Sequence, residues 1–280
     1  MQRSLLPIAI TAALSFTAYA AFVQFAPFTV PVVQNQVDTN MMRAQNFLRA
    51  RPQTVLVGSS LTFRLPPALL EPQVSNIGMV GGSSLTGLAI VDGSGQRPRL
   101  VLVETNLLER PLDQPTIDSQ LRFPERFLRD HLRVFRTGYD PANLLWFGLT
   151  TLTHQVNAEF VVTPEAARAF LAEQRKYKSH PPDSATFHQR LNQAAALVAS
   201  LEAKGIKVGF FELPIDKALA NSPADTFIRR EVAKAFPPGR YCWLDLGVQA
   251  GAHTLDGVHL TTPDAAIVAR KVLAQQHKCF

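Results

Sequence analysis

Residues 54–60 read Thr-Val-Leu-Val-Gly-Ser-Ser, a short apolar run that ends in one glycine and two serines. Four further apolar runs follow, at residues 74–79, 100–105, 207–213 and 241–246. Continuous runs of Val, Leu, Ile and Phe are typical of strands that are buried on both faces of a parallel sheet. Helical patterns separate several of these runs. The sequence therefore predicts an α/β domain with three layers, α/β/α, around a five-stranded parallel sheet.

Helices are expected between and after these apolar runs. Apolar residues recur at helical spacing from Phe187 to Leu201, and Gly205 ends that pattern before the fourth run. Thr262-Pro263 begins the last predicted helix, because proline suits the first helical position. A shorter helix is expected over residues 40–50. Residues 110–185 separate the third and fourth runs by more than a usual crossover, and we expect them to form a largely helical insert.

The chain starts with a long apolar stretch. No charged residue occurs from Ser4 to Asn35, and residues 5–26 are about as long as a bilayer-spanning helix. Ala18-Tyr19-Ala20 has the small-x-small pattern of a cleavage site, so a cleaved signal peptide is one alternative and a buried helix is another. The apolar run continues well past Ala20, which favours an uncleaved anchor.

These features predict an organisation and a location. Residues 1–36 would be a signal anchor and linker, with Gln34 to Asp38 as the exit from the bilayer, and residues 37–280 would be one catalytic domain. Arg3 precedes the span, which favours an N-terminus on the inner side. We therefore expect a single-pass protein of the inner membrane with its domain on the outer, periplasmic side. Signal cleavage would instead leave a secreted or periplasmic domain.

Polar residues follow several predicted strands, at the sheet edge where ligands bind in such folds. Ser60 follows the first strand, and residues 256–263 read Asp-Gly-Val-His-Leu-Thr-Thr-Pro near the C-terminus. A serine hydroxyl needs a base to take its proton, and a carboxylate fixes the tautomer of that base. The sequence predicts Ser60 as nucleophile, His259 as general base and Asp256 as its orienting group. Ser59 is the rival nucleophile, and a backbone carbonyl is the alternative to Asp256.

Four short blocks resemble those of the SGNH (GDSL-type) hydrolase family, over most of residues 52–275. The first block, usually Gly-Asp-Ser, is Gly58-Ser59-Ser60 here. The second is similar to residues 76–84, with Gly81 at its central glycine. The third, Gly-x-Asn-Asp, keeps Asn106 but has Glu104 and Leu107 at the flanking positions. The last, Asp-x-x-His followed by a helix that starts with proline, matches residues 256–269 closely.

This resemblance implies a flavodoxin-like fold and a chemistry. The oxyanion donors would be the N–H groups of Ser60 and Gly81 and the side-chain amide of Asn106, although Gly81 could serve only a tight turn. No metal or organic cofactor would be required. The anchor, the Gly-Ser-Ser block and the insert resemble a membrane-tethered branch that includes proteins of alginate O-acetylation and teichoic-acid D-alanylation. The expected substrate is an O-acetyl or O-acyl ester of an envelope polysaccharide, with other envelope-assembly proteins as partners.

Two other functions stay open at this point. One is a membrane-associated lipid esterase or thioesterase, and the other is a catalytically silent glycan-binding subunit of an export machine. Nucleic acid is not expected as a partner, because the net charge of +6 is moderate and no basic-aromatic interleaving, zinc-type spacing or phosphate loop occurs.

Four further features lead to expectations. Residues 124–136 read as a helix that carries arginines on one face, either solvated or directed at phospholipid headgroups or an anionic glycan. Residues 144–147, Leu-Leu-Trp-Phe, read as core, a lid or a patch resting on a membrane. Cys242 and Cys279 form one bridge or remain two thiols. Glu104 and Glu212 are expected to pair with nearby arginines or to contact substrate.

Overall fold

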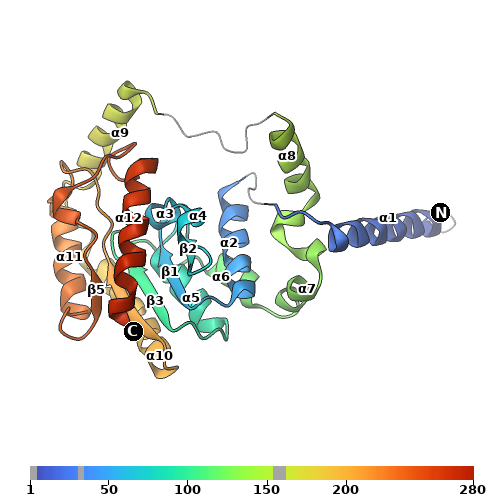
Figure 1. Cartoon of the computed structure of the whole chain (residues 1–280), viewed down its shortest axis with the longest axis horizontal. Coiled ribbons are helices and arrows are strands. Elements are labelled where there is room, and N and C mark those ends of the chain that lie inside the picture. Colours follow the sequence, from blue (N-terminus) through green and yellow to red (C-terminus); the bar gives the residue numbers. More distant parts are fainter. Residues whose placement is uncertain (1–4, 31–34, 154–161) are drawn as a thin grey trace.

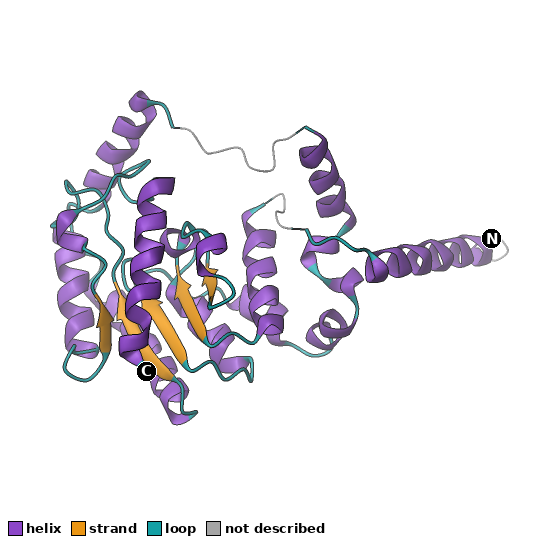
Figure 2. Cartoon of the chain, viewed as in Figure 1, coloured by secondary structure: helices purple, strands orange, loops and turns teal. Residues whose placement is uncertain are grey.

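The sheet has five strands, all parallel, in the order β2-β1-β3-β4-β5 (Figure 2). The computed structural model describes residues 5–30, 35–153 and 162–280. The five strands predicted from the apolar runs are confirmed, with ends that differ by one or two residues. The strands are β1 (Thr54–Gly58), β2 (Val74–Gly78), β3 (Leu100–Glu104), β4 (Lys207–Phe211) and β5 (Cys242–Leu244).

Helices cover both faces of the sheet and give the three expected layers (Figure 1). Side chains alternate along β1, so that Val55 and Val57 enter one core while Leu56 enters the other. The first core is closed by α2 (Gln36–Ala50), α5 (Ser84–Gly93), α10 (Ser184–Ala203) and α11 (Pro223–Ala235). The second core is closed by α3 (Ser60–Phe63), α4 (Pro67–Leu70) and α12 (Thr262–Gln275).

The insert between β3 and β4 is helical wherever regular structure is described, and residues 154–161 lie outside the described chain. It starts beside α2 and α5 and ends over the carboxyl edge of the sheet. Its elements are α6 (Gln114–Leu121), α7 (Glu125–His131), η2 (Arg133–Phe135), η3 (Thr137–Tyr139), α8 (Pro141–Leu152) and α9 (Pro164–Tyr177). Short 3₁₀ turns near the C-terminus complete the fold: η4 (Val248–Ala250) and η5 (Gln276–Cys279).

The helix expected over residues 124–136 is wrong in its second half. Leu132 has an extended backbone, with φ −120° and ψ 118°, and this ends α7 before the η2 turn. The arginines consequently do not form one continuous face. Their guanidinium groups donate to main-chain carbonyls of other segments: Arg126 to Ser94, Arg133 to Ala26 and Arg136 to Arg129.

The N-terminal helix α1 (Leu5–Phe25) projects away from the α/β body (Figure 1). It is long and apolar enough to cross a membrane, by length and composition. Its C-terminal half contacts the body, where Tyr19 donates a hydrogen bond of 2.6 Å to the carbonyl of Tyr139. Arg3 and residues 31–34 of the expected linker lie outside the described residues.

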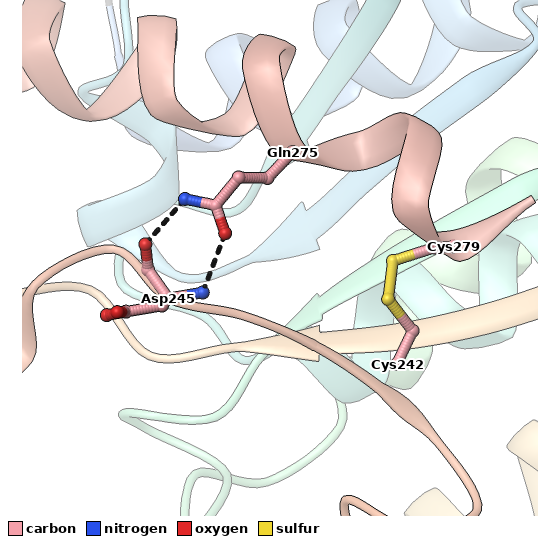
Figure 3. The surroundings of a disulfide bond; sticks show 4 residues. All are labelled: Cys242, Asp245, Gln275 and Cys279. Atoms are coloured by element: carbon pink, nitrogen blue, oxygen red, sulfur yellow. Dashed lines mark hydrogen bonds between the residues drawn. A yellow bond between two sulfur atoms is a disulfide. The ribbon is translucent and has the colours of Figure 1, made fainter.

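Cys242 and Cys279 form a disulfide that joins the start of β5 to η5, with a Cα–Cα distance of 5.4 Å (Figure 3). Beside it, Asp245 and Gln275 exchange two hydrogen bonds: the Asp245 N–H donates to Gln275 Oε1, and Gln275 Nε2 donates to the Asp245 carbonyl. These links tie the C-terminal tail to the edge strand. The disulfide lies at the first residue of β5, whereas the Asp245–Gln275 pair lies just after its last residue, Leu244.

Candidate active site

Ser60, His259 and Asp256 form one hydrogen-bonded chain, although 199 residues separate the first two along the sequence. Ser60 Oγ lies 2.8 Å from His259 Nε2, and His259 Nδ1 lies 2.6 Å from Asp256 Oδ2. With its proton on Nδ1, the imidazole donates to Asp256, and Nε2 is free to accept the hydroxyl proton of Ser60. This is the arrangement that activates a serine for attack on a carbonyl.

The loop before α12 fixes the base and its carboxylate. Asp256 Oδ1 accepts the backbone N–H groups of Val258 and His259, at 3.1 and 2.8 Å. Gly257 adopts φ +97°, and the Gly257 carbonyl accepts the N–H of Asp216. Burial alone would raise the pKa of Asp256, but the hydrogen bonds from His259 and Val258 outweigh it and lower this pKa. The carboxylate therefore stays ionised at neutral pH and can stabilise an imidazolium.

The nucleophile lies where β1 passes into α3. Ser59 is the helix N-cap, and its Oγ accepts the N–H of Leu61. The buried carboxylate of Glu104, at the end of β3, accepts the Ser59 and Thr62 N–H groups and both of their hydroxyls. Gly58 is required beside it, because a Cβ there would lie 2.6 Å from Glu104 Oε2. Glu104 thus fixes the turn that presents Ser60.

Of the two glutamates at the strand ends, only one forms the expected ion pair. Glu212 binds Arg229 with two hydrogen bonds, of 2.8 and 2.6 Å. The prediction of an arginine partner for Glu104 is wrong, because Ser59 and Thr62 donate to the oxygens of the Glu104 carboxylate. Ser59 and Thr62 both lie just after β1. They are uncharged, so a search of the sequence for oppositely charged partners of Glu104 finds only arginines. Neither glutamate is among the residues that line the cavity at Ser60.

A cavity of about 270 Å³ opens at Ser60 and His259. Asn106 lines it, as the sequence predicts, and its side chain exchanges two hydrogen bonds with the backbone of Leu213. The Asn106 amide has a second N–H beyond the one that donates to Leu213. Its role as an oxyanion donor at Ser60 stays a prediction.

Gly81 does not line the same cavity. It borders a neighbouring groove of about 580 Å³ with Gln36 and Asn40, and Arg110 is the residue that lines both spaces. The Asn40 side chain holds the loop through two hydrogen bonds to Val80, and Gly81 itself has φ +71°. This geometry accounts for the glycine by its backbone conformation, whereas an oxyanion role for its N–H stays a prediction.

The insert supplies a wall of the cavity that sequence reasoning missed. Glu173, Gln174 and Tyr177 of α9 line it, together with Lys178. Lys178 is buried and pairs with Asp225 of α11 at 2.5 Å, which fixes the end of α9 against the body. The sequence offered only the length of the insert as a signal, because no motif marks these residues.

No protein-family model matches this chain, and no curated protein matches it either. Membership of the SGNH family therefore stays a prediction that is carried by the four sequence blocks. The α/β fold with a five-stranded parallel sheet is independent of that assignment. So is the contact among Ser60, His259 and Asp256, at the carboxyl edge where β1 and β3 lie side by side.

Proposed function

We propose that the protein catalyses serine-dependent acyl-ester chemistry, as an esterase or an O-acyltransferase. The observation that carries the proposal is the hydrogen-bonded chain from Ser60 Oγ through His259 to Asp256. It opens into a cavity, so an ester carbonyl can reach the hydroxyl. A purely glycan-binding subunit has no need of such a chain, and this favours catalysis over a silent role.

The proposed reaction has two halves. Ser60 Oγ attacks the ester carbonyl while His259 Nε2 takes its proton, and the oxyanion accepts hydrogen bonds from the Asn106 amide and nearby backbone N–H groups. Collapse of the tetrahedral intermediate breaks the ester C–O bond, and His259 returns the proton to the leaving alcohol. The acyl group is then on Ser60. Water or an acceptor hydroxyl, deprotonated by His259, removes it in the second half.

The substrate that we propose is a small O-acyl ester, such as an O-acetyl group, on an envelope polysaccharide. The cavity, at about 270 Å³, is slightly smaller than the usual range of ligand sites, about 300–1,000 Å³, which favours a short acyl group. Tyr177, Glu173 and Gln174 supply an aromatic face and polar groups for a hydroxyl-rich acceptor. The disulfide supports an oxidising compartment, and α1 supports attachment to a membrane.

A lipid ester is the second candidate substrate. Leu61, Leu107, Ile215 and Val258 give the cavity an apolar side, and exposed apolar side chains lie on the insert. A series of p-nitrophenyl esters separates the two candidates. We expect acetyl esters to be cleaved faster than long acyl esters, and the reverse order would favour a lipid substrate.

The nucleophile is tested with a fluorophosphonate probe and p-nitrophenyl acetate, on the full chain in detergent. Ser60→Ala should abolish labelling and lower turnover by at least about a thousandfold, because no other hydroxyl faces His259 in the described site. Ser59→Ala is the matched control. It removes a helix cap and the hydrogen bond from this hydroxyl to buried Glu104, which together cost about 1–3 kcal/mol of stability, but the variant should still be labelled at Ser60.

Two results would contradict the proposal. Labelling lost in Ser59→Ala but kept in Ser60→Ala would move the nucleophile by one residue. Near-normal turnover in His259→Ala, with an activated ester, would remove the general base from the mechanism.

A further inference from the structure

Helix α8 packs Leu144 and Phe147 against the body, yet it also buries polar side chains and leaves three leucines exposed. Its buried polar side chains are Asn143, 2% exposed, and Thr150. Asn143 donates to Asp38 and to the carbonyl of Thr137, so its polar groups are satisfied inside the protein. Leu145, Leu149 and Leu152, by contrast, are 66%, 51% and 79% exposed. Their spacing of four and three residues places them on one face.

A second apolar surface lies on the preceding segment. Phe127 on α7 and Leu132 and Phe135 around η2 are exposed, and Phe123 just before α7 is 77% exposed. Leaving so many large side chains in water is unfavourable, at about 1.5–3 kcal/mol for each one that could be fully buried. We call the side chains Phe127, Leu132, Phe135, Leu145, Leu149 and Leu152 the apolar platform.

One member of the apolar platform, Phe135, contacts the candidate membrane helix. The ring of Phe16 in α1 lies 6.3 Å from the ring of Phe135. Gln24 Oε1 accepts the N–H of Arg133, whose guanidinium donates to the Ala26 carbonyl. A small shared core that includes Val23 and Tyr139 fixes α1 to the insert. In Figure 1, α7 and α8 lie next to the end of α1 where it joins the body.

The depth of this contact follows from helix geometry. Phe16 precedes the end of α1 by nine residues, so Phe135 lies about 14 Å along the helix axis from that end. The side chains of Phe22 and Phe25 on α1 are still exposed and apolar beyond this level. If α1 spans a bilayer whose hydrocarbon core is about 30 Å thick, its 21 residues leave little length outside the core, so the Phe135 contact brings the insert into the boundary region on that side.

We propose that the apolar platform is immersed in the outer boundary of the same bilayer that α1 crosses. The inference rests on the membrane attachment that the proposed function includes, and it adds that the insert, not the anchor alone, holds the catalytic domain at the lipid surface. Arg122, next to Phe123, is exposed, and a cation beside an exposed aromatic ring suits a lipid phosphate. A second protein could also cover this face, but a lipid occupant is favoured because the Phe16–Phe135 contact places the platform at bilayer depth.

The chain carries its own probe of this surface. Its two tryptophans are Trp146, on α8 beside Leu145 and Leu149, and Trp243, whose ring stacks on Phe210 at 5.3 Å in the core. The test reconstitutes the full chain in phosphatidylethanolamine–phosphatidylglycerol vesicles that contain lipids brominated near the headgroup end of the acyl chain. In Trp243→Phe, which leaves Trp146 alone, we expect a blue-shifted emission and strong quenching. Trp146→Phe, the matched control, should be quenched several-fold less.

A third variant separates failure of the inference from failure of the membrane attachment. Phe16→Trp in a background without Trp146 and Trp243 should be quenched if α1 is inserted. Quenching at Phe16→Trp with none at Trp146 would overturn the inference and leave the face to a protein partner or a second copy. An absence of quenching at both positions would overturn the anchor as well. Neither readout depends on turnover, so an inactive enzyme gives the same answer.

Discussion

Single residues account for two of this chain's departures from the SGNH sequence pattern. Two of the three departures are Ser59 in place of Asp and Glu104 in place of Gly, and these two side chains contact each other. The carboxylate that the pattern places in the first block is supplied here from β3. It binds the Ser59 and Thr62 donors, so both changes are parts of one local arrangement.

Glu104 is accordingly a positioning residue, and its removal should affect Ser60 indirectly. Glu104→Ala leaves the buried donors of Ser59 and Thr62 unsatisfied, which should lower the free energy of unfolding by about 3 kcal/mol. Displacement of Ser60 from His259 should lower kcat by about a hundredfold with little change in KM. Glu104→Gln keeps one accepting oxygen, so its kcat and its free energy of unfolding should lie between those of Glu104→Ala and the unchanged chain. Steady-state kinetics and chemical denaturation measure both effects.

Glu212 is the matched control for this prediction. It also follows a strand at the carboxyl edge, but it pairs with Arg229 and does not line the cavity. Glu212→Gln should leave kcat within about twofold, because Glu212 does not line the cavity at Ser60, although loss of its largely buried ion pair with Arg229 should lower stability. Equal losses of kcat in Glu104→Gln and Glu212→Gln would contradict a specific role for Glu104.

The residues of the site differ in how far sequence reasoning could find them. Ser60, Asp256 and His259 were predictable, because each stands in a short motif with the spacing that its chemistry needs. Glu104 was misassigned, because its partners are hydroxyl and N–H groups from 42–45 residues away, and a charge pattern does not show them. Arg110, Tyr177 and Lys178 stand in no motif at all, so only the folded chain brings them to Ser60.

At the level of elements, buried strands were the predictable part. Their apolar runs are continuous because both faces of the sheet are covered by helices, and the prediction needs no knowledge of the partners. The insert was harder to predict. Its arginines recur at helical spacing, yet the backbone breaks at Leu132, and the guanidinium groups bind carbonyls of Ala26 just after α1, Ser94 just after α5 and Arg129 in α7. The conformation of this segment is set by its tertiary contacts, and the spacing of its arginines does not predict it.

The disulfide is an element-scale constraint that can be separated from catalysis. It joins β5 to η5 across a separation of 37 residues, so losing it should lower stability by about 3–4 kcal/mol through the entropy of the unfolded chain. In Cys242→Ser/Cys279→Ser, the denaturation midpoint should fall while kcat at low temperature stays near that of the unchanged chain. A large loss of kcat in this double variant, at a temperature where the variant is folded, would contradict the prediction and show that the C-terminal tail influences the active site.

At the scale of the whole molecule, α1 is both a candidate membrane span and a part of the fold. Residues 6–18 are exposed along the helix, whereas Val23 and Ala26 are buried against the body. Cleavage after Ala20 would keep these two residues but remove Tyr19 and its hydrogen bond to Tyr139. The contact therefore favours an anchor that is retained.

The last prediction concerns location, because it decides which substrates the site can meet. We expect the full chain to resist extraction by carbonate and to keep its N-terminus. A reporter that is active only outside the cytoplasm should be active when it is joined through a flexible linker after Phe280. The linker is needed because the Phe280 ring lies under Arg99 and Cys279 is in the disulfide.

A soluble species that starts at Ala21 would replace the anchor with a signal peptide. A reporter active only in the cytoplasm would exclude an envelope polysaccharide, since the ester would then have to be intracellular.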